Sequence, residues 1–380
     1  MQFALLSEGL YPDKIGGIQK HSFLLVQELA RKGIYIDIYT HVHRSYEIDR
    51  HFSVELLPFI KLIAVPFRNS KVYFPGHFLY ESWVRSKELN ELVSASAKEY
   101  DFVYVQGFAG MSYLRNPLSG ATSILNFHGL EMFQRAASLK IKAQHLIFRP
   151  FVEYCIRLAD YSVSLGGRLT DILANLTDKE KILVTPIGVD TTWLCNDDTT
   201  LVKHEPRRYV FVGRYERRKG VQELHEALQR IGPRANFSFT FIGPVPEEEQ
   251  LDLPHISYLG LIKDQEIIRT TLRKADVLVC PSWSEGMPTV ILEGMSSACA
   301  IIATDVGATA NLVSSKNGWL IPAGDVTALH HALQLASTIP LQELIAKKQE
   351  SLRLVKSKYT WDKVVDLFLC QLQDLQSTEA

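Results

Sequence analysis

Two glutamates in the last third of the chain carry carboxylates at a spacing suited to two hydroxyl-rich groups. Glu285 stands in a loop after the apolar run 275–280, and Glu293 follows eight residues later in a helix-like segment. At 1.5 Å per helical residue, the two lie at most roughly 12 Å apart. Carboxylates accept strong hydrogen bonds from hydroxyl groups. Glu293 alone would read as a helix-surface charge, but its neighbours Leu292 and Met295 are apolar.

Cations are concentrated on a second loop. Arg214 follows an apolar run, Lys219 comes five residues later, and Arg217 and Arg218 lie between them. At the carboxyl end of a strand, an arginine fork and a lysine point charge can neutralise a diphosphate without a metal ion. A solvated basic loop is the alternative reading, and the position at a strand end favours a binding role.

Two turns are suited to hold an anion with backbone amides. Gly16 and Gly17 lie between the first apolar run and the first helix-like segment, where glycine lets amides approach a phosphate. A simple turn before a helix explains them equally well. Pro288 suits the first turn of the helix that carries Glu293, which leaves the amides there free to face an anion.

Several kinds of site are missing from the sequence. It contains no Asp-x-Asp triplet, no Gly-x-Gly-x-x-Gly after a strand and no Walker motif, and its five cysteines have no zinc spacing. We therefore expect no metal ion and no cofactor.

The elements that must position these loops follow a βα rhythm. Continuous apolar strands separated by helices indicate parallel sheets covered on both faces, an α/β fold of the doubly wound type. The predicted strands are 3–6, 35–40, 54–59, 102–105, 123–127, 161–165 and 182–185, then 208–213, 237–242, 256–259, 277–280, 301–304 and 318–321.

The alternation of predicted strands and helices is interrupted once, which predicts two domains. The first covers residues 1–190, a polar linker covers 191–207, and the second covers 208–359. The final helix, about 360–380, is expected to pack back on the first domain. The 380 residues are 46% hydrophobic and 22% charged with a net charge of −1, which excludes disorder, a disulfide scaffold and wholesale binding of nucleic acid.

Five segments together resemble the motifs of the retaining glycosyltransferases of family 4, which have the GT-B fold of two Rossmann-like domains facing across a cleft. They occur in the family's order between residues 11 and 319. The segments are Gly16-Gly17, Phe127-His128-Gly129, Ile187-Gly-Val-Asp190, Gly213-Arg-Tyr-Glu-Arg-Arg-Lys219-Gly220 and Glu285-Gly-Met-Pro-Thr-Val-Ile-Leu-Glu293.

The resemblance implies a role for each charged residue. Glu285 would hold hydroxyls of the donor sugar and Glu293 the ribose, while Arg214 and Lys219 would clamp the diphosphate. It also implies that residues 1–190 bind the acceptor and residues 208–359 bind the nucleotide sugar.

The uncharged positions follow in the same way. His128 would face the donor sugar, and Gly16 and Gly17 would line the diphosphate from the first domain. The donor-binding loop would be completed by Gly286, Met287, Pro288 and Thr289.

The reaction implied is transfer of a sugar from a UDP- or GDP-sugar to an acceptor hydroxyl with retention of configuration, in polysaccharide, lipopolysaccharide or glycolipid synthesis. A nucleotide-sugar epimerase of the same architecture and a non-catalytic sugar-nucleotide binder are the alternatives. Two positions depart from the family: Ile187 replaces the usual Asn, and Gly294 replaces an Ala at a cost of about 1 kcal/mol in helix propensity.

Two basic and aromatic stretches bear on the acceptor. Residues 57–87 and 132–157 each have a net charge of +4 with interleaved aromatic residues, which suits contact with an anionic membrane and a lipid-linked acceptor. Burial of the same aromatics in the core is the alternative. No signal peptide or membrane span is evident, so we expect a cytoplasmic protein that contacts the inner membrane face at most peripherally.

Overall fold

The first half of the chain forms a seven-stranded sheet. The computed structural model describes residues 1–43, 46–67, 76–195 and 206–379. In the first sheet every described pair of neighbouring strands is parallel, and the order is β3-β2-β1-β4-β5-β6-β7. Its strands are β1 (Gln2–Ser7), β2 (Tyr35–Val42), β3 (Ile60–Pro66), β4 (Phe102–Gln106), β5 (Thr122–Asn126), β6 (Tyr161–Ser164) and β7 (Ile182–Val184). Its helices are α1 (Gly17–Arg31), α2 (His77–Ser94), α3 (Leu139–Leu158) and α4 (Arg168–Ala174).

The second half repeats this plan with six parallel strands in the order β10-β9-β8-β11-β12-β13. Its strands are β8 (Arg207–Val212), β9 (Phe237–Ile242), β10 (Ile256–Tyr258), β11 (Val277–Cys280), β12 (Ala300–Thr304) and β13 (Gly318–Ile321). The helices are α5 (Val221–Ile231), α6 (Gln265–Lys274), α7 (Thr289–Ser296), α8 (Thr309–Leu312), α9 (Val326–Thr338), α10 (Leu341–Lys358) and α11 (Trp361–Glu379). Both sheets have the doubly wound order, which confirms the predicted α/β fold class.

One predicted strand was wrong. The run 54–59 was expected to form β3, but residues 57–59 form a 3-10 turn and the strand occupies Ile60–Pro66. Pro58 lies at the start of this turn, where its fixed φ fits. A proline has no N–H for a strand ladder, so pairing with β2 begins only after it. Leu56, just before the turn, is buried in the hydrophobic core.

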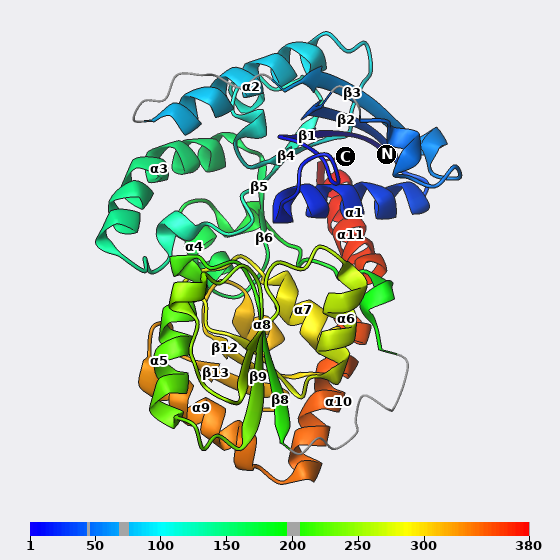
Figure 1. Cartoon of the computed structure of the whole chain (residues 1–380). Coiled ribbons are helices and arrows are strands. Elements are labelled where there is room, and N and C mark those ends of the chain that lie inside the picture. Colours follow the sequence, from blue (N-terminus) through cyan, green and yellow to red (C-terminus); the bar gives the residue numbers. More distant parts are fainter. Residues whose placement is uncertain (44–45, 68–75, 196–205, 380) are drawn as a thin grey trace.

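The chain crosses between the two sheets more than once. After β7, Val189 bridges to Thr360, and its amide donates to the carbonyl of Tyr359 at 2.7 Å. The chain continues from Thr360 into helix α11, which lies against α1 of the first half (Figure 1). Most of the expected linker 191–207 lies outside the described residues, since 196–205 are not described, and residues 191–193 form a 3-10 turn.

Candidate active site

The predicted loops meet where the strand order of each sheet reverses. In the second sheet the reversal lies between β8 and β11, and the basic loop and the Glu285 loop follow these two strands. In the first sheet it lies between β1 and β4. Ligands bind at such points because the loops diverge and leave a crevice at the carboxyl ends of the strands. A cavity of about 430 Å³ lies here, and both halves of the chain line it.

Most of the predicted site residues line this cavity. They are Gly17, His128, Arg214, Lys219, Glu285, Gly286, Met287, Pro288 and Thr289. Gly16 and Glu293 are not among the lining residues: Gly16 is the N-cap of α1, and Glu293 lies one turn into α7. A Cβ on Gly17 would meet no atom within 4 Å, so this glycine leaves open space at the amino terminus of α1.

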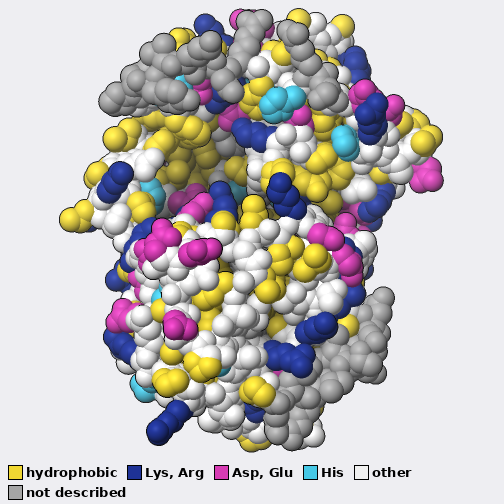
Figure 2. Space-filling view, viewed as in Figure 1, with side chains coloured by type: hydrophobic (Ala, Val, Ile, Leu, Met, Phe, Trp, Pro, Cys, Tyr) yellow, Lys and Arg dark blue, Asp and Glu magenta, His cyan; other side chains and the backbone are white. Residues whose placement is uncertain are grey.

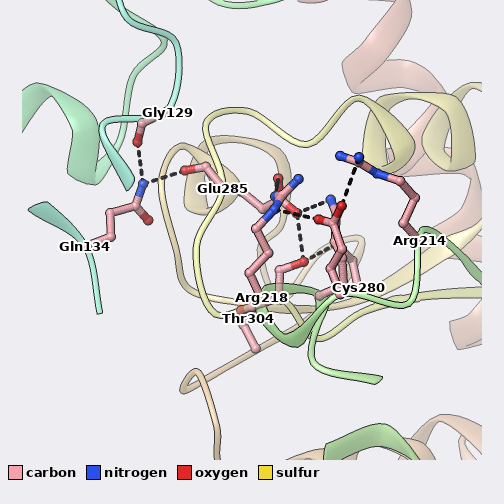
Figure 3. Close-up of polar contacts among 10 residues, drawn as sticks. Gly129, Gln134, Arg214, Arg218, Cys280, Glu285 and Thr304 are labelled. Carbon is pink, nitrogen blue, oxygen red and sulfur yellow. Dashed lines mark hydrogen bonds and ion pairs between the residues drawn. The ribbon is translucent and has the colours of Figure 1, made fainter. Parts of the chain in front are cut away.

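Glu285 is the centre of a buried polar network (Figure 3). Its Oε1 accepts hydrogen bonds from Lys219 Nζ at 2.5 Å and from Ser282 Oγ at 2.8 Å, and Arg218 Nη1 lies 3.5 Å from its Oε2. Burial alone would raise the pKa of Glu285, but the charges of Lys219 and Arg218 outweigh burial and hold that pKa below its usual value. The carboxylate is therefore ionised at neutral pH.

The cations of the basic loop divide into two groups. Arg214, Arg218 and Lys219 line the cavity. Arg217 does not: it forms two hydrogen bonds to the Glu223 carboxylate, at 2.6 and 2.9 Å, and stacks 5.1 Å from the ring of Trp283. The side chain of Arg214 is 69% exposed and pairs with Glu216 at 2.9 Å. It can therefore turn towards a ligand without breaking a buried contact.

His128 reaches the cavity from the loop after β5, with a left-handed φ of 61°. Its Nε2 lies 2.6 Å from Oε1 of Gln106, whose amide group lies 3.3 Å from Nδ1 of His21. Burial lowers the pKa of His128 to about 3, and burial next to His128 lowers the pKa of His21 well below its usual value. Both rings are therefore neutral at pH 7, and His128 donates Nε2–H to Gln106.

Glu293 lines a smaller neighbouring cavity of about 50 Å³ and faces the first half of the chain. Lys20 of α1 lies 3.8 Å from its carboxylate and 5.8 Å from the Trp193 ring. Burial raises the pKa of Glu293, and the Lys20 charge opposes that rise. Thr289 lines both cavities, so a ligand that passes it reaches from Glu285 to Glu293.

Glycine is required where the two halves touch. A Cβ on Gly286 would lie 2.9 Å from the carbonyl oxygen of His128 and 3.3 Å from the Cα of Gly129. Gln134 spans the same junction, because its amide group donates to the carbonyls of Gly129 at 2.5 Å and Glu285 at 2.6 Å (Figure 3). The approach of these backbones sets one wall of the cavity.

Four residues of the site were missed in the sequence: Gln106, Glu131, Gln134 and Ser282. Glu131 lines the cavity, and the other three hold residues that do. Gln106 ends β4 at the reversal of the first sheet, which is the one signal that pointed to it. Nothing in the sequence pattern marked the other three.

No metal site is evident in the part of the chain that the structure describes. Among these residues, no three His, Cys, Asp or Glu side chains come together in a group that could hold an ion. The described helices also include none that is long and apolar enough to cross a membrane.

Comparison with known proteins identifies the family of this site. Residues 15–193 match the sequence model described as Glycosyltransferase Family 4, and residues 206–337 match that of Glycosyl transferases group 1. A putative teichuronic acid biosynthesis glycosyltransferase, TuaC of Bacillus subtilis, is 32% identical over 162 residues, which is 40% of each chain.

Solved structures show the same fold over the whole length. Sucrose-phosphate synthase from Thermosynechococcus elongatus is 18% identical and covers 100% of both chains with a TM-score of 0.78. Anabaena HepE in complex with UDP and glucose is 15% identical and covers 99% of this chain and all of its own, with a TM-score of 0.67. The family models match both halves and the two sheets face across the cavity, so the chain belongs to glycosyltransferase family 4 and has the GT-B fold.

Proposed function

We propose that the protein transfers a sugar from a nucleotide diphosphate sugar to an acceptor hydroxyl, with retention of configuration and without a metal ion. The observation that carries this proposal is the ion pair of the half-buried Lys219 with the buried Glu285, which lines the same cavity as His128. It offers one cation for a diphosphate and one carboxylate for sugar hydroxyls within the same 430 Å³. The complex of HepE with UDP and glucose supports a donor of this class.

Negative charge develops on the diphosphate as the sugar leaves. Lys219, Arg214 and the free amides at the start of α1 would stabilise this charge. Lys219 would exchange part of its contact with Glu285 for the phosphate, while the sugar hydroxyls take up the carboxylate oxygens. These contacts supply the role for which other transferases use a metal ion.

The geometry favours a positioning role for His128 rather than proton abstraction. Its pKa of about 3 makes it a weak base, and its Nε2 is bound to Gln106. The diphosphate oxygen that leaves is then the group that accepts the acceptor proton, on the same face of the sugar. Attack on that face retains the configuration.

The exposed apolar residues of α2 and α3 support a membrane-associated acceptor. Phe78, Trp83 and Phe151 are 52%, 39% and 42% exposed, and Phe78 contacts Phe148 of α3 at a ring distance of 5.7 Å. Figure 2 shows hydrophobic side chains around a hollow between the two halves of the molecule. Residues 68–75 of the basic and aromatic stretch 57–87 lie outside the described residues. We propose peripheral contact with the cytoplasmic face of a membrane, in synthesis of an envelope polysaccharide or glycolipid, as the name of TuaC suggests.

The test is nucleotide release from a panel of UDP- and GDP-sugars, with and without lipid-linked and soluble saccharide acceptors. Acceptor-dependent release with a retained anomer supports the proposal, and it should persist in EDTA. Isomerisation of the sugar without acceptor would indicate an epimerase, and binding without turnover would indicate a sensor. Loss of activity in EDTA that Mn²⁺ restores would contradict the metal-free mechanism.

The matched variants are Lys219→Ala and Arg217→Ala, which each remove one cation from the same loop. Lys219→Ala should cost about 2–4 kcal/mol of transition-state stabilisation, because its charge faces the diphosphate in a desolvated site. Arg217→Ala should change the rate far less, since that side chain pairs with Glu223 outside the cavity. Equal rates in the two variants would remove the basic loop from the mechanism.

A further inference from the structure

Glu131 is an acidic residue of the cavity for which the proposed function gives no role. It begins a 3-10 turn just after the His128 loop and lines the same cavity as Glu285. Its carboxylate folds back over Gly129, where a Cβ would lie 2.3 Å from a carboxylate oxygen. The glycine therefore makes room for this carboxylate at the cavity wall.

The cations near Glu131 already form ion pairs with other carboxylates. Lys219 is bound to Glu285 at 2.5 Å, and Arg218 is shared by Glu216 at 3.0 Å and Glu285 at 3.5 Å. Among the described residues, no cation forms an ion pair with Glu131. Burial raises the pKa of Glu131 and the charge of Glu285 adds to the rise, while the charges of Arg218 and Lys219 oppose it. The two carboxylates thus share one crowded and partly desolvated region.

We propose that Glu131 is a second hydroxyl-binding carboxylate of the donor-sugar subsite and that it restricts the donor to uncharged sugars, the hexoses and N-acetylhexosamines. This inference rests on the proposed function. A uronic acid would bring a third carboxylate beside Glu131 and Glu285, and the nearby cations Arg218 and Lys219 already have partners. Like charges in a desolvated site repel strongly, so selection comes from exclusion of the anionic sugar as well as from contact with the neutral one.

The test measures donor binding by calorimetry for three proteins: the wild type, Glu131→Gln and Glu223→Gln. The ligands are UDP-glucose with UDP-glucuronate, UDP-galactose with UDP-galacturonate, GDP-mannose with GDP-mannuronate, and free UDP and GDP. Glu223→Gln is the matched control because it removes a carboxylate that pairs with Arg217, and neither residue lines the cavity.

The wild type should bind the neutral sugar of a pair at least about tenfold more tightly than its uronate. Glu131→Gln should reduce this ratio to below about threefold, mainly through tighter uronate binding, and should leave the affinity for free nucleotide unchanged. Glu223→Gln should keep the wild-type ratio, because its partner Arg217 lies outside the cavity.

Two results would overturn the inference alone: a wild type that does not prefer the neutral sugar, or a Glu131→Gln variant that keeps the full preference. A change in thermal stability of Glu131→Gln with an unchanged ratio would show that the carboxylate serves the loop and not the sugar. A wild type that binds no nucleotide and no nucleotide sugar would overturn the proposed function as well, so the two failures are distinguishable.

Discussion

At the level of single residues, the proposed function requires the site to exchange protein partners for ligand groups. Glu285 has Lys219, Arg218 and Ser282 as partners in the free protein, and Glu293 has Lys20. Each carboxylate is thereby kept close to a cation while no ligand is bound, which avoids the cost of an isolated buried charge. A donor that supplies hydroxyls to both carboxylates also releases Lys219 towards the diphosphate.

Changing each of the two glutamates to glutamine should therefore impair different steps, nucleotide binding for Glu293 and turnover for Glu285. Glu293→Gln should weaken binding of both the donor and the free nucleotide diphosphate, because the ribose belongs to both. Glu285→Gln should leave affinity for the free nucleotide nearly intact while turnover falls by roughly 10²-fold, since this contact positions only the sugar. Calorimetry with the nucleotide and initial rates with the donor make the comparison. Equal loss of nucleotide affinity in both variants would show that their roles are not divided in this way.

The neutral histidines predict a loss of stability in mild acid. The folded protein holds His128 neutral down to about pH 3, whereas the unfolded chain binds a proton below about pH 6.5. The unfolded state is thus increasingly favoured as the pH falls below 6.5. Well above pH 6.5 neither state binds this proton, so His128 does not change the unfolding free energy there. Between pH 7.5 and 5.5 this one group should cost about 1.4 kcal/mol of unfolding free energy.

Urea unfolding at the two pH values checks this expectation with two variants. His128→Gln should lose about 1.4 kcal/mol less than the wild type over that interval. Leu367→Ala is the control, because it changes an exposed side chain that binds no proton and should keep the pH dependence of the wild type. The same pH dependence in His128→Gln and the wild type would contradict the buried neutral state.

The sequence singled out most of the charged residues that line the cavity, but it missed Glu131 and the polar residues that hold the others in place. Glu285, Lys219 and Arg214 stand out because charges follow apolar strands at a fixed spacing. Gln134 bonds to Glu285, 151 positions away, and this contact exists only because the two halves approach each other. A polar residue whose task is set by tertiary approach leaves no local pattern.

At the level of elements, the strands were predictable because parallel strands buried on both faces are continuous apolar runs. The β3 error shows the limit of this rule. Residues 54–59 are apolar enough for a strand, but residues 57–59, which include Pro58, form a 3-10 turn. In the true strand at Ile60–Pro66 only Ile60 is buried and the other residues are half-buried or exposed, as suits a strand at the edge of the sheet.

The loops that end these strands are fitted to one another, and Gly286 tests the fit. Gly286→Ala places a Cβ 2.9 Å from the backbone oxygen of His128, an atom that cannot rotate away. The two loops must then separate, which should lower kcat/KM by about tenfold or more because the donor contacts come from both sides. Circular dichroism and thermal unfolding should show that each sheet remains folded. An unchanged kcat/KM would mean that the loops need not approach so closely during the reaction.

At the level of the whole molecule, the end of the chain ties the two halves together. Helix α10 belongs to the second half, where Lys348 forms a buried pair with Asp276 at 2.9 Å. Helix α11 then returns to the first half, where Phe368 packs against Phe3 and Tyr104 at ring distances of 6.5 and 5.7 Å. The final helix and its return to the first domain are both predictions from the sequence, whereas its particular partners Phe3 and Tyr104 are set by tertiary approach.

This anchoring should be measurable as stability that depends on a single aromatic ring. Phe368 is 1% exposed, and its neighbour Leu367 is 44% exposed on the same helix. Phe368→Ala should lower the unfolding free energy by about 3–5 kcal/mol, because it leaves a cavity between α11 and the first sheet. Leu367→Ala should stay within about 0.5 kcal/mol of the wild type, since a surface change leaves no cavity. Urea unfolding of both variants is the measurement, and hydrogen exchange at β1 and β4 should rise only in Phe368→Ala. Similar small losses in the two variants would show that α11 contributes little to holding the first sheet.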